Sequence, residues 1–536
     1  MSELAETSQE SGWLPLDRRS LLVTAQMTGG VVTAIGLPVT LSFQGWVDMG
    51  PVVAWAVGLG LLVIASGVGL DALRLRHSRY RVGPERAELR SGVLFAKHRS
   101  LNRERIRSVD LVAHPLLRLL GLVEVRIGTG EQSSAQEATL ELRPVRRAEG
   151  ERLRRELLSR AAPDAAPDAE GTIAALDLRW VRYAPLSFIT SALAAAAGGA
   201  VMQVSEWFGA QEEVIEWVGD VFRGMSVTGM VLALVAVGLA AGSVGALGLW
   251  IGMWWNYRLD REPSGTLRVR RGLFTTRSIS LEEARLRGVD VVEPLGLRLS
   301  GAARVDAVAT GLSRRDEEDH AGPNTLLPAA PRRLADDVAA RVLREPVTPT
   351  AARLTAHPRA ARARRVRWAV SAATAPALVL LLLGALLELP VLMYLGAGFA
   401  VVLVPVAVAL AHDAYRSLGH ALDGGYLVVR SGTLRRSTVA LRRGGVIGWT
   451  VKQSALQRRA GLVTLSATTA AGAQAYAAYD VGEAEGLEFA ERAVPGLLGP
   501  FLERGPGTVP GARGTARPAT TDPRRYRRPQ RATRCS

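Results

Sequence analysis

The side chains that could catalyse a reaction or bind a metal are few in this 536-residue chain. None of the seven histidines lies at metal-ligand spacing from another histidine, a cysteine or a carboxylate cluster. The single cysteine, Cys535, excludes an internal disulfide and a cysteine-based metal site. The sequence also lacks a phosphate-binding loop and a Gly-x-Ser-x-Gly nucleophile turn. We therefore expect no enzymatic activity, no catalytic residue, no metal and no cofactor.

Arginine is the residue type whose clustering suggests a different chemistry, the binding of anions. Of the 66 basic residues only Lys97 and Lys452 are lysines, and the net charge is +16. Such a balance is typical of nucleic-acid-binding proteins, but the placement of the charges, described below, argues against nucleic acid as a partner. A cluster on one stretch of the first charged block predicts a basic binding surface formed by Arg99, Arg103, Arg105, Arg107 and Arg118.

Six long stretches of the sequence contain no Asp, Glu, Lys or Arg, and the charged residues lie between them. Each is long enough for the roughly 20 apolar helical residues that cross a bilayer, whereas buried helices of soluble proteins are usually shorter and carry a polar face. The sequence therefore predicts six transmembrane helices in three hairpins, over residues 20–70, 183–257 and 368–412. The uncharged stretches are Ser20–Val47, Met49–Leu70, Tyr183–Ser205, Gly224–Tyr257, Trp368–Leu387 and Leu389–His412.

Charge asymmetry predicts the orientation of the hairpins. Their turns carry seven acidic residues but a single base, Arg223, while the other 65 basic residues lie on the opposite side. The positive-inside rule then places both termini and all charged blocks in the cytoplasm. There the arginines that precede residue 368 and the basic tail 504–536 meet anionic lipid headgroups before any nucleic acid. The tail, rich in Pro, Gly and Thr, is predicted to be disordered.

The charged blocks that follow the hairpins are copies of one sequence unit. Three copies in register after three hairpins indicate a hairpin-plus-domain unit repeated three times. The glycines that recur are predicted to occupy turns with positive φ or closely packed sites, which is a structural role. An alignment without gaps superimposes Gly92, Gly272 and Gly432; Val109, Val289 and Trp449; Arg118, Arg298 and Arg458; and Gly121, Gly301 and Gly461.

Within each block the pattern predicts short β-strands followed by one helix. Val123–Ile127 and Thr139–Arg143 alternate apolar and polar residues, and Leu153 and Leu157 mark one face of an otherwise charged segment. The expected fold class is six transmembrane α-helices with three cytoplasmic β-rich domains, each closed by a C-terminal helix. Outside the hairpins, the expected segments are an N-terminal segment 1–19, domains 77–160, 258–345 and 414–503, linkers 161–182 and 346–367, and the tail.

Three motifs of the first block, Leu89–Phe95, Arg105–Val109 and Pro115–Leu122, resemble the bacterial PH-like domain. The resemblance is to the YdbT-like subtype, whose members carry repeated hairpin-plus-PH-like units. It covers nearly the whole chain outside the linkers and tail, and is clear in the first copy and fair in the second. The third copy is degenerate, because Gln457–Ala460 replaces an apolar run. The resemblance implies two near-orthogonal antiparallel sheets with a C-terminal helix, in an integral protein of a bacterial plasma membrane, but no single agreed activity.

These features favour a non-enzymatic, polytopic membrane protein whose domains dock or assemble protein partners or anionic lipid, in a role in the cell envelope. The expected partners are membrane lipids and either another protein or a second copy of the chain. The alternative is a transporter, or an export accessory, for lipids or small molecules. Transport coupled to ions usually needs ionisable residues within the spans, and the predicted spans contain no Asp, Glu, Lys or Arg.

Overall fold

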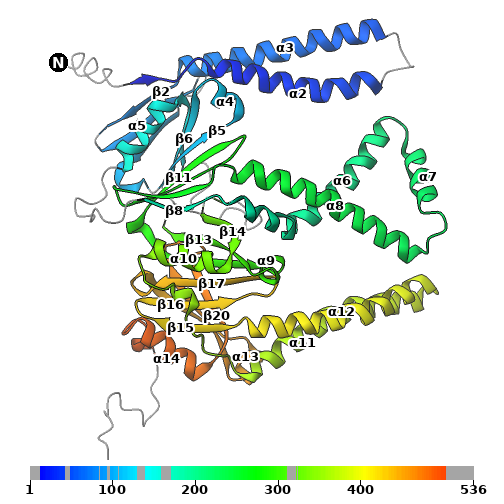
Figure 1. Cartoon of the computed structure of the whole chain (residues 1–536), viewed down its shortest axis with the longest axis vertical. Coiled ribbons are helices and arrows are strands. Elements are labelled where there is room, and N and C mark those ends of the chain that lie inside the picture. Colours follow the sequence, from blue (N-terminus) through cyan, green and yellow to red (C-terminus); the bar gives the residue numbers. More distant parts are fainter. Residues whose placement is uncertain are drawn as a thin grey trace, which may run out of the picture.

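The protein is described by a computed structural model that covers residues 13–42, 49–83, 85–92, 97–106, 108–128, 139–158, 171–310, 322 and 324–501. The β-sheets are stacked in one row, and three helical hairpins leave this row on the same side (Figure 1). The tail 504–536, for which disorder is predicted, lies outside the described residues.

Each hairpin contains two helices that are long and apolar enough to cross a membrane. In the most apolar 18-residue window of each helix, at most 11% of the residues are buried, so apolar side chains cover the outer surface. A continuous apolar surface of this size is stable when lipid, not water, covers it. The helices are α2 (Ser20–Ser42) and α3 (Met49–Arg76), α6 (Phe188–Trp207) and α8 (Val227–Trp254), and α11 (Arg359–Leu386) and α12 (Pro390–Arg416), with the short α7 (Gln211–Val221) in the second turn.

Small residues let the helices of a hairpin approach closely. A Cβ atom on Gly242 of α8 would lie 2.2 Å from the carbonyl oxygen of Thr190 in α6, so only glycine fits there. At the charged end of the first hairpin, the Thr24 hydroxyl donates to Asp71 Oδ2 at 2.6 Å. Helix α3 therefore extends past its uncharged stretch, as α11 and α12 also do, and its polar end is held by a contact within the hairpin.

The same order of elements follows each hairpin: three strands, a 3-10 turn, a strand, a short helix, two strands and a closing helix. Unit 1 contains β2 (Arg79–Val82), β3 (Arg86–Ser91), β4 (Lys97–Asn102), η2 (Arg103–Arg105), β5 (Ser108–Ala113), α4 (Pro115–Leu119), β6 (Leu122–Gly128), β7 (Thr139–Arg146) and α5 (Arg147–Leu158). Unit 2 contains β9 (Arg258–Glu262), β10 (Thr266–Arg271), β11 (Thr276–Glu282), η5 (Glu283–Arg285), β12 (Leu286–Pro294), α9 (Leu295–Leu299), β13 (Ala302–Ala309), β14 (Thr325–Pro331) and α10 (Arg332–Leu343). Unit 3 contains β15 (Gly419–Asp423), β16 (Tyr426–Ser431), β17 (Arg435–Arg442), η7 (Arg443–Gly445), β18 (Val446–Lys452), α13 (Ala455–Arg459), β19 (Leu462–Thr469), β20 (Ala475–Gly482) and α14 (Glu483–Ala493), followed by η8 (Gly499–Phe501).

The segments before the hairpins belong to the sheets, which differs from the linkers expected at 161–182 and 346–367. The strand β1 (Leu14–Pro15) pairs with β2, and β8 (Gly171–Ala175) pairs with β9 in the same way. Before the third hairpin, Thr355 forms a single bridge to His420 of β15. The described parts of these segments also contain η4 (Leu178–Leu186) and η6 (Pro349–Ala351). Each structural unit thus begins before its hairpin and ends at its closing helix.

Consecutive units share a sheet, so the β-rich domains are joined edge to edge, which the sequence pattern did not predict. A seven-stranded sheet has the order β7-β6-β5-β11-β10-β9-β8, and a six-stranded sheet has the order β14-β13-β12-β17-β16-β15. The row is completed by a four-stranded sheet, β1-β2-β3-β4, and a three-stranded sheet, β18-β19-β20. Sequence alternation correctly placed strands here, but it contains no information on which edge meets which.

Inside a unit, the two sheets and the closing helix share one apolar core. In unit 1, Leu89 of β3, Val109 of β5, Leu142 of β7 and Leu153 of α5 are all buried in this core. Burying one aliphatic side chain contributes roughly 1.5–3 kcal/mol. The few leucines of α5 therefore suffice to dock a helix that is otherwise strongly charged.

The six repeated glycines all have positive φ, from 61° at Gly461 to 137° at Gly92. The turn between β10 and β11 shows why one such position needs glycine. Gly272 has a φ of 112°, and a Cβ on it would lie 2.0 Å from the carbonyl oxygen of Thr275. A residue with a side chain would have to distort this turn.

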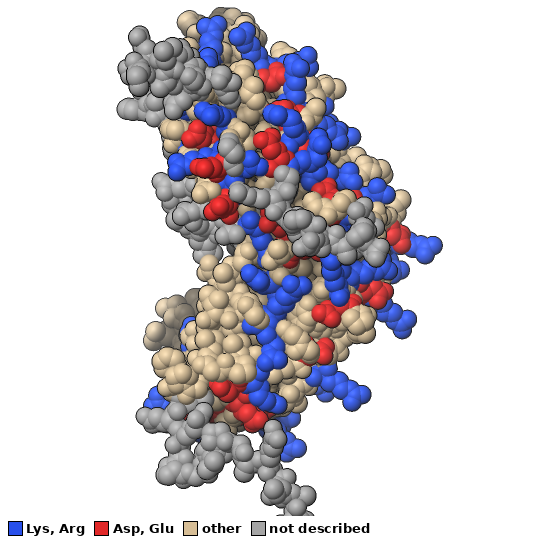
Figure 2. All heavy atoms as spheres, turned by 90° about the vertical axis from the view of Figure 1, so that its left-hand side faces the viewer, with Lys and Arg blue, Asp and Glu red and all other residues tan. Residues whose placement is uncertain are grey.

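The face of the row that points away from the hairpins is charged. Figure 2 shows this face, over which Lys and Arg side chains lie among Asp and Glu side chains. Apolar and charged surfaces are therefore separated between the two sides of the molecule, as the sequence blocks predict.

A buried histidine pair fixes the segment before the third hairpin to unit 3. His357 Nε2 lies 3.1 Å from His420 Nδ1, and the His420 ring packs edge-on against Phe489 of α14. Glu485 lies 3.8 Å from His420 Nε2. Burial, together with the charges of His357 and Arg492, lowers the pKa of His420 to about 4.

We expect this pair to make the fold acid-sensitive. Since the folded-state pKa of His420 lies below its ordinary value of 6.5, the unfolded chain takes up a proton first as the pH falls. Stability should therefore drop by roughly 2–3 kcal/mol between pH 6.5 and pH 4, and level off below. The measurement is the Tm of the full chain against pH, compared with a His420→Gln variant. If the two curves stay parallel across this window, the assignment to His420 is wrong.

Candidate functional site

A groove of about 750 Å³ lies at the joint between units 1 and 2. Its walls come from β5 and α4 of unit 1, from β10 and β11 of unit 2, and from Trp255–Arg258, which directly follow α8. We call it the inter-unit groove. It opens close to the base of a hairpin and is rich in guanidinium groups. Among the residues that the structure describes, one acidic side chain, Glu151, lines it together with Arg118, Arg147, Arg258, Arg268, Arg270, Arg271 and Arg277.

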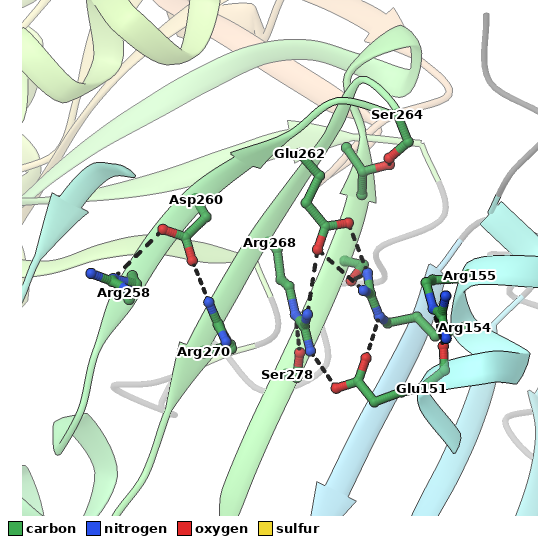
Figure 3. Close-up of polar contacts among 12 residues, drawn as sticks. Glu151, Arg154, Arg155, Arg258, Asp260, Glu262, Ser264, Arg268, Arg270 and Ser278 are labelled. Carbon is green, nitrogen blue, oxygen red and sulfur yellow. Dashed lines mark hydrogen bonds and ion pairs between the residues drawn. The ribbon is translucent and has the colours of Figure 1, made fainter. Parts of the chain in front are cut away.

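Three of these arginines are neutralised by neighbouring carboxylates (Figure 3). Arg268 donates to Glu151 Oε1 at 2.6 Å and to Ser278 Oγ at 2.8 Å. Asp260 lies between Arg270 and Arg258, at 2.7 and 3.7 Å. Because the residues of β10 alternate in direction, Arg268 and Arg270 share one face of the sheet.

Behind Arg268, Arg154 of α5 joins unit 1 to unit 2. Its side chain is only 5% exposed and makes a bidentate contact with Glu262 of β9, at 2.9 and 3.1 Å. It also donates to Glu151 at 3.1 Å (Figure 3). Burial lowers the pKa of Arg154, but the two carboxylates outweigh this effect and raise it above its usual value. Burial likewise raises the pKa of Glu151, yet Arg268 and Arg154 hold it below its usual value.

A fourth arginine is held by an aromatic ring. The Arg271 guanidinium lies 4.5 Å from the ring centre of Trp254, the last residue of α8, and donates to the carbonyl oxygen of Gly322 at 3.1 Å. This cation–π contact couples the end of the second hairpin to β10.

Three exposed arginines carry positive charge that the groove does not neutralise. Arg118 donates to the backbone carbonyl of Leu273 at 2.9 Å, which leaves its charge uncompensated. Arg147 and Arg277 are exposed and form no salt bridge within the described residues. Guanidinium groups bind phosphate and carboxylate oxygens through paired hydrogen bonds. The groove is therefore suited to an anionic group that approaches from the side of the hairpins.

Of the five arginines of the predicted basic surface, Arg118 is the one that lines the described part of the groove. Arg103 points inward and donates to the carbonyl oxygens of Gly83 and Glu156, which fixes the end of α5. Arg99 lies on the outer strand β4. Arg105 belongs to η2, and Arg107 lies outside the described residues.

The predicted basic surface does not include most of the groove arginines, because they come from unit 2 and from the start of α5. The sequence did contain a signal for two of them, since Arg268 and Arg270 are two residues apart in a strand and therefore lie on the same face of it. Their proximity to Arg118 and Arg147 depends on the β5–β11 pairing, which alternation cannot predict.

Units 1 and 3 resemble a known protein family. Two segments match the family described as Bacterial PH domain, residues 32–161 and 368–491. Each Bacterial PH domain match begins within a hairpin and ends in or after the closing helix of the same unit, so hairpin and sheets are matched together. One match falls on unit 3, although its sequence departs most from the repeat. No curated protein and no solved structure matches the chain.

Proposed function

We propose that this chain is a non-enzymatic, polytopic protein of a bacterial plasma membrane, of the YdbT-like kind, that docks anionic lipid through its cytoplasmic PH-like row. The six apolar hairpin helices and the Bacterial PH domain matches support the architecture. The orientation rests on the acidic turns and the basic opposite side. In this arrangement the row lies beneath the bilayer and serves as an assembly platform.

One observation carries the lipid-binding part of the proposal. The inter-unit groove lies beside the residues that follow α8, and the described part of its lining contains seven arginines and one acidic residue. In a membrane this position is the depth of the phospholipid headgroups. A basic residue near that surface contributes about 1 kcal/mol of attraction to anionic lipid.

The test is binding of phosphatidylglycerol to the full chain in mild detergent after removal of bound lipid. We expect phosphatidylglycerol, but not phosphatidylcholine, to raise the Tm and to appear as bound lipid in native mass spectrometry. The double variant R147A/R277A should weaken this binding by about 2 kcal/mol, or roughly 30-fold. Higher salt should weaken binding to the unsubstituted protein as well.

A matched control removes the same charge elsewhere. Arg155 of α5 and Arg333 of α10 are exposed and do not line the groove, so R155A/R333A should bind phosphatidylglycerol as the unsubstituted chain does. Equal binding by both double variants would mean that the groove is not the lipid site. Equal binding of the two lipids would contradict headgroup recognition altogether.

A further inference from the structure

The two joints between units are built in the same register. In the first joint, Val109 of β5 pairs with Ser280 of β11. In the second, Val289 of β12 pairs with Ala440 of β17. Val109 and Val289 occupy equivalent positions of the repeat, 17 residues after Gly92 and Gly272. Ser280 and Ala440 are also equivalent, eight residues after Gly272 and Gly432. The sequence repeat thus encodes one joint, used twice.

A side-chain contact accompanies each joint. Arg118 of α4 donates to the carbonyl oxygen of Leu273 at 2.9 Å, across the first joint. Its equivalent in unit 2, Arg298, donates to the carbonyl oxygen of Thr433 at 3.4 Å and to Asp413 at 2.8 Å, across the second. Leu273 and Thr433 each directly follow the turn glycine of the next unit. The third equivalent, Arg458, is exposed and makes no such contact within the described residues.

The ends of the row present the two halves of this joint without a partner strand. Within the described residues, β4 pairs only with β3, and β18 pairs only with β19. Val451 of β18 is 43% exposed, whereas its equivalents Leu111 and Val291, which lie in joints, are 5% and 0% exposed. Leu101 of β4 has leucine equivalents, Leu281 and Leu441, at 3% and 1% exposure. The apolar pattern that the joints bury is therefore retained at both free edges.

We propose that copies of this chain associate head to tail, with β18 of one copy pairing antiparallel with β4 of the next in the register of the internal joints. Trp449 of one copy then lies opposite Ser100 of the next, and Thr450 lies opposite Arg99. Because the hairpins of one chain leave the row on the same side (Figure 1), a copy added through the same joint keeps its hairpins in the same membrane. The interface is heterologous, so assembly gives either a closed ring or an open chain.

The only two lysines of the protein bear on the strength of this contact. Lys97 lies in β4 and Lys452 in β18, and the register places these two positions opposite each other. The internal joints have Val112 opposite Arg277 and Val292 opposite Ser437 at this point. Lysine on an edge strand opposes unregulated pairing. One like-charged pair weakens but does not outweigh a whole strand pairing, so the association is reversible and strengthens as salt screens the lysines.

Disulfide crosslinking tests the register. In a Cys535→Ser background, Ser100→Cys combined with Trp449→Cys should give covalent dimers and longer multimers on oxidation in membranes. The two positions lie at opposite ends of the row, so each crosslink joins two different copies, and the last crosslink can close a ring of several copies. As the matched control, Ser100→Cys combined with Thr450→Cys points the second thiol to the other face of the strand and should crosslink little. Equal crosslinking of both pairs, or of neither, would overturn the proposal.

Charge reversal tests the contact without crosslinking. Lys97→Glu alone and Lys452→Glu alone each turn the like-charged pair into an opposite-charged one, and each should tighten self-association about fivefold. The double variant K97E/K452E restores a like-charged pair and should return to the unsubstituted value. Sedimentation velocity of the detergent-solubilised full chain measures this. A double variant that associates more tightly than either single variant, or four proteins that behave alike, would refute direct pairing of these strands.

Discussion

Replacing Arg154 with alanine is expected to lower the free energy of unfolding by about 4 kcal/mol, because a buried cation that joins two units is removed. Its side chain is 5% exposed and contacts Glu151 and Glu262, which come from different units. Without Arg154, Arg268 is the one guanidinium among the described residues that still pairs with both carboxylates. The first joint should then open, which hydrogen exchange at the amides of β5 and β11 would report together with a lower Tm.

The same helix offers a control for Arg154. Arg152 forms a salt bridge with Glu149 at 2.7 Å, but its side chain is 54% exposed. An exposed pair of this kind contributes less than about 1 kcal/mol, so Arg152→Ala should leave exchange at the joint unchanged. Comparable loss of stability in the two variants would show that the contacts of Arg154 are not what joins the units.

Replacing Asp480 with alanine is expected to cost about as much, roughly 4 kcal/mol, and to loosen the third hairpin. The Asp480 carboxylate is buried, lies 2.6 Å from Arg364 and 3.3 Å from Arg365 at the start of α11, and accepts a hydrogen bond from Gln457 at 2.9 Å. Its loss leaves two half-buried guanidinium groups beside each other. Both arginines line a cavity next to α12, so that surface should become more open to hydrogen exchange.

Two further substitutions separate charge from backbone effects at Asp480. This residue has a φ of 58°, which asparagine also tolerates. Asp480→Asn therefore keeps the backbone and a hydrogen-bond acceptor but removes the charge, and should recover only part of the loss. Glu488→Ala, which removes an exposed partner of Arg492, should change the Tm little. Full recovery with asparagine would mean that the ion pairs with α11 contribute nothing.

The hairpins could be predicted well because their signal is local. A stretch of about 20 uncharged residues must bury its backbone polar groups in its own helix once it enters lipid. Length and composition therefore predict the element without knowledge of its neighbours, as Ser20–Val47 and α2 illustrate. The helices α3, α11 and α12 run longer than their uncharged stretches, and charged residues at their ends, such as Asp71 and Arg364, have partners on the hairpin or the sheets.

Arginines that are close in sequence serve different purposes in this fold. Arg103 satisfies backbone carbonyls at the end of α5, and Arg118 spans the first joint. The sequence alone does not distinguish these two roles, because both residues are arginines in a charged segment. The cations that gather in the groove, such as Arg147 and Arg277, are 130 residues apart and meet through pairing between units.

Residue patterns within one element, or compared between equal segments, are enough to predict the separation of apolar and charged blocks, the threefold repeat and the alternation of the strands. They do not predict that the units are fused through β5–β11 and β12–β17, which the folded structure shows. Strand pairing is made by backbone groups that every residue carries, so the pattern of side chains predicts which face of a strand is buried but not which edge it joins. The groove and the two unpaired outer edges, β4 and β18, both follow from that choice of partner.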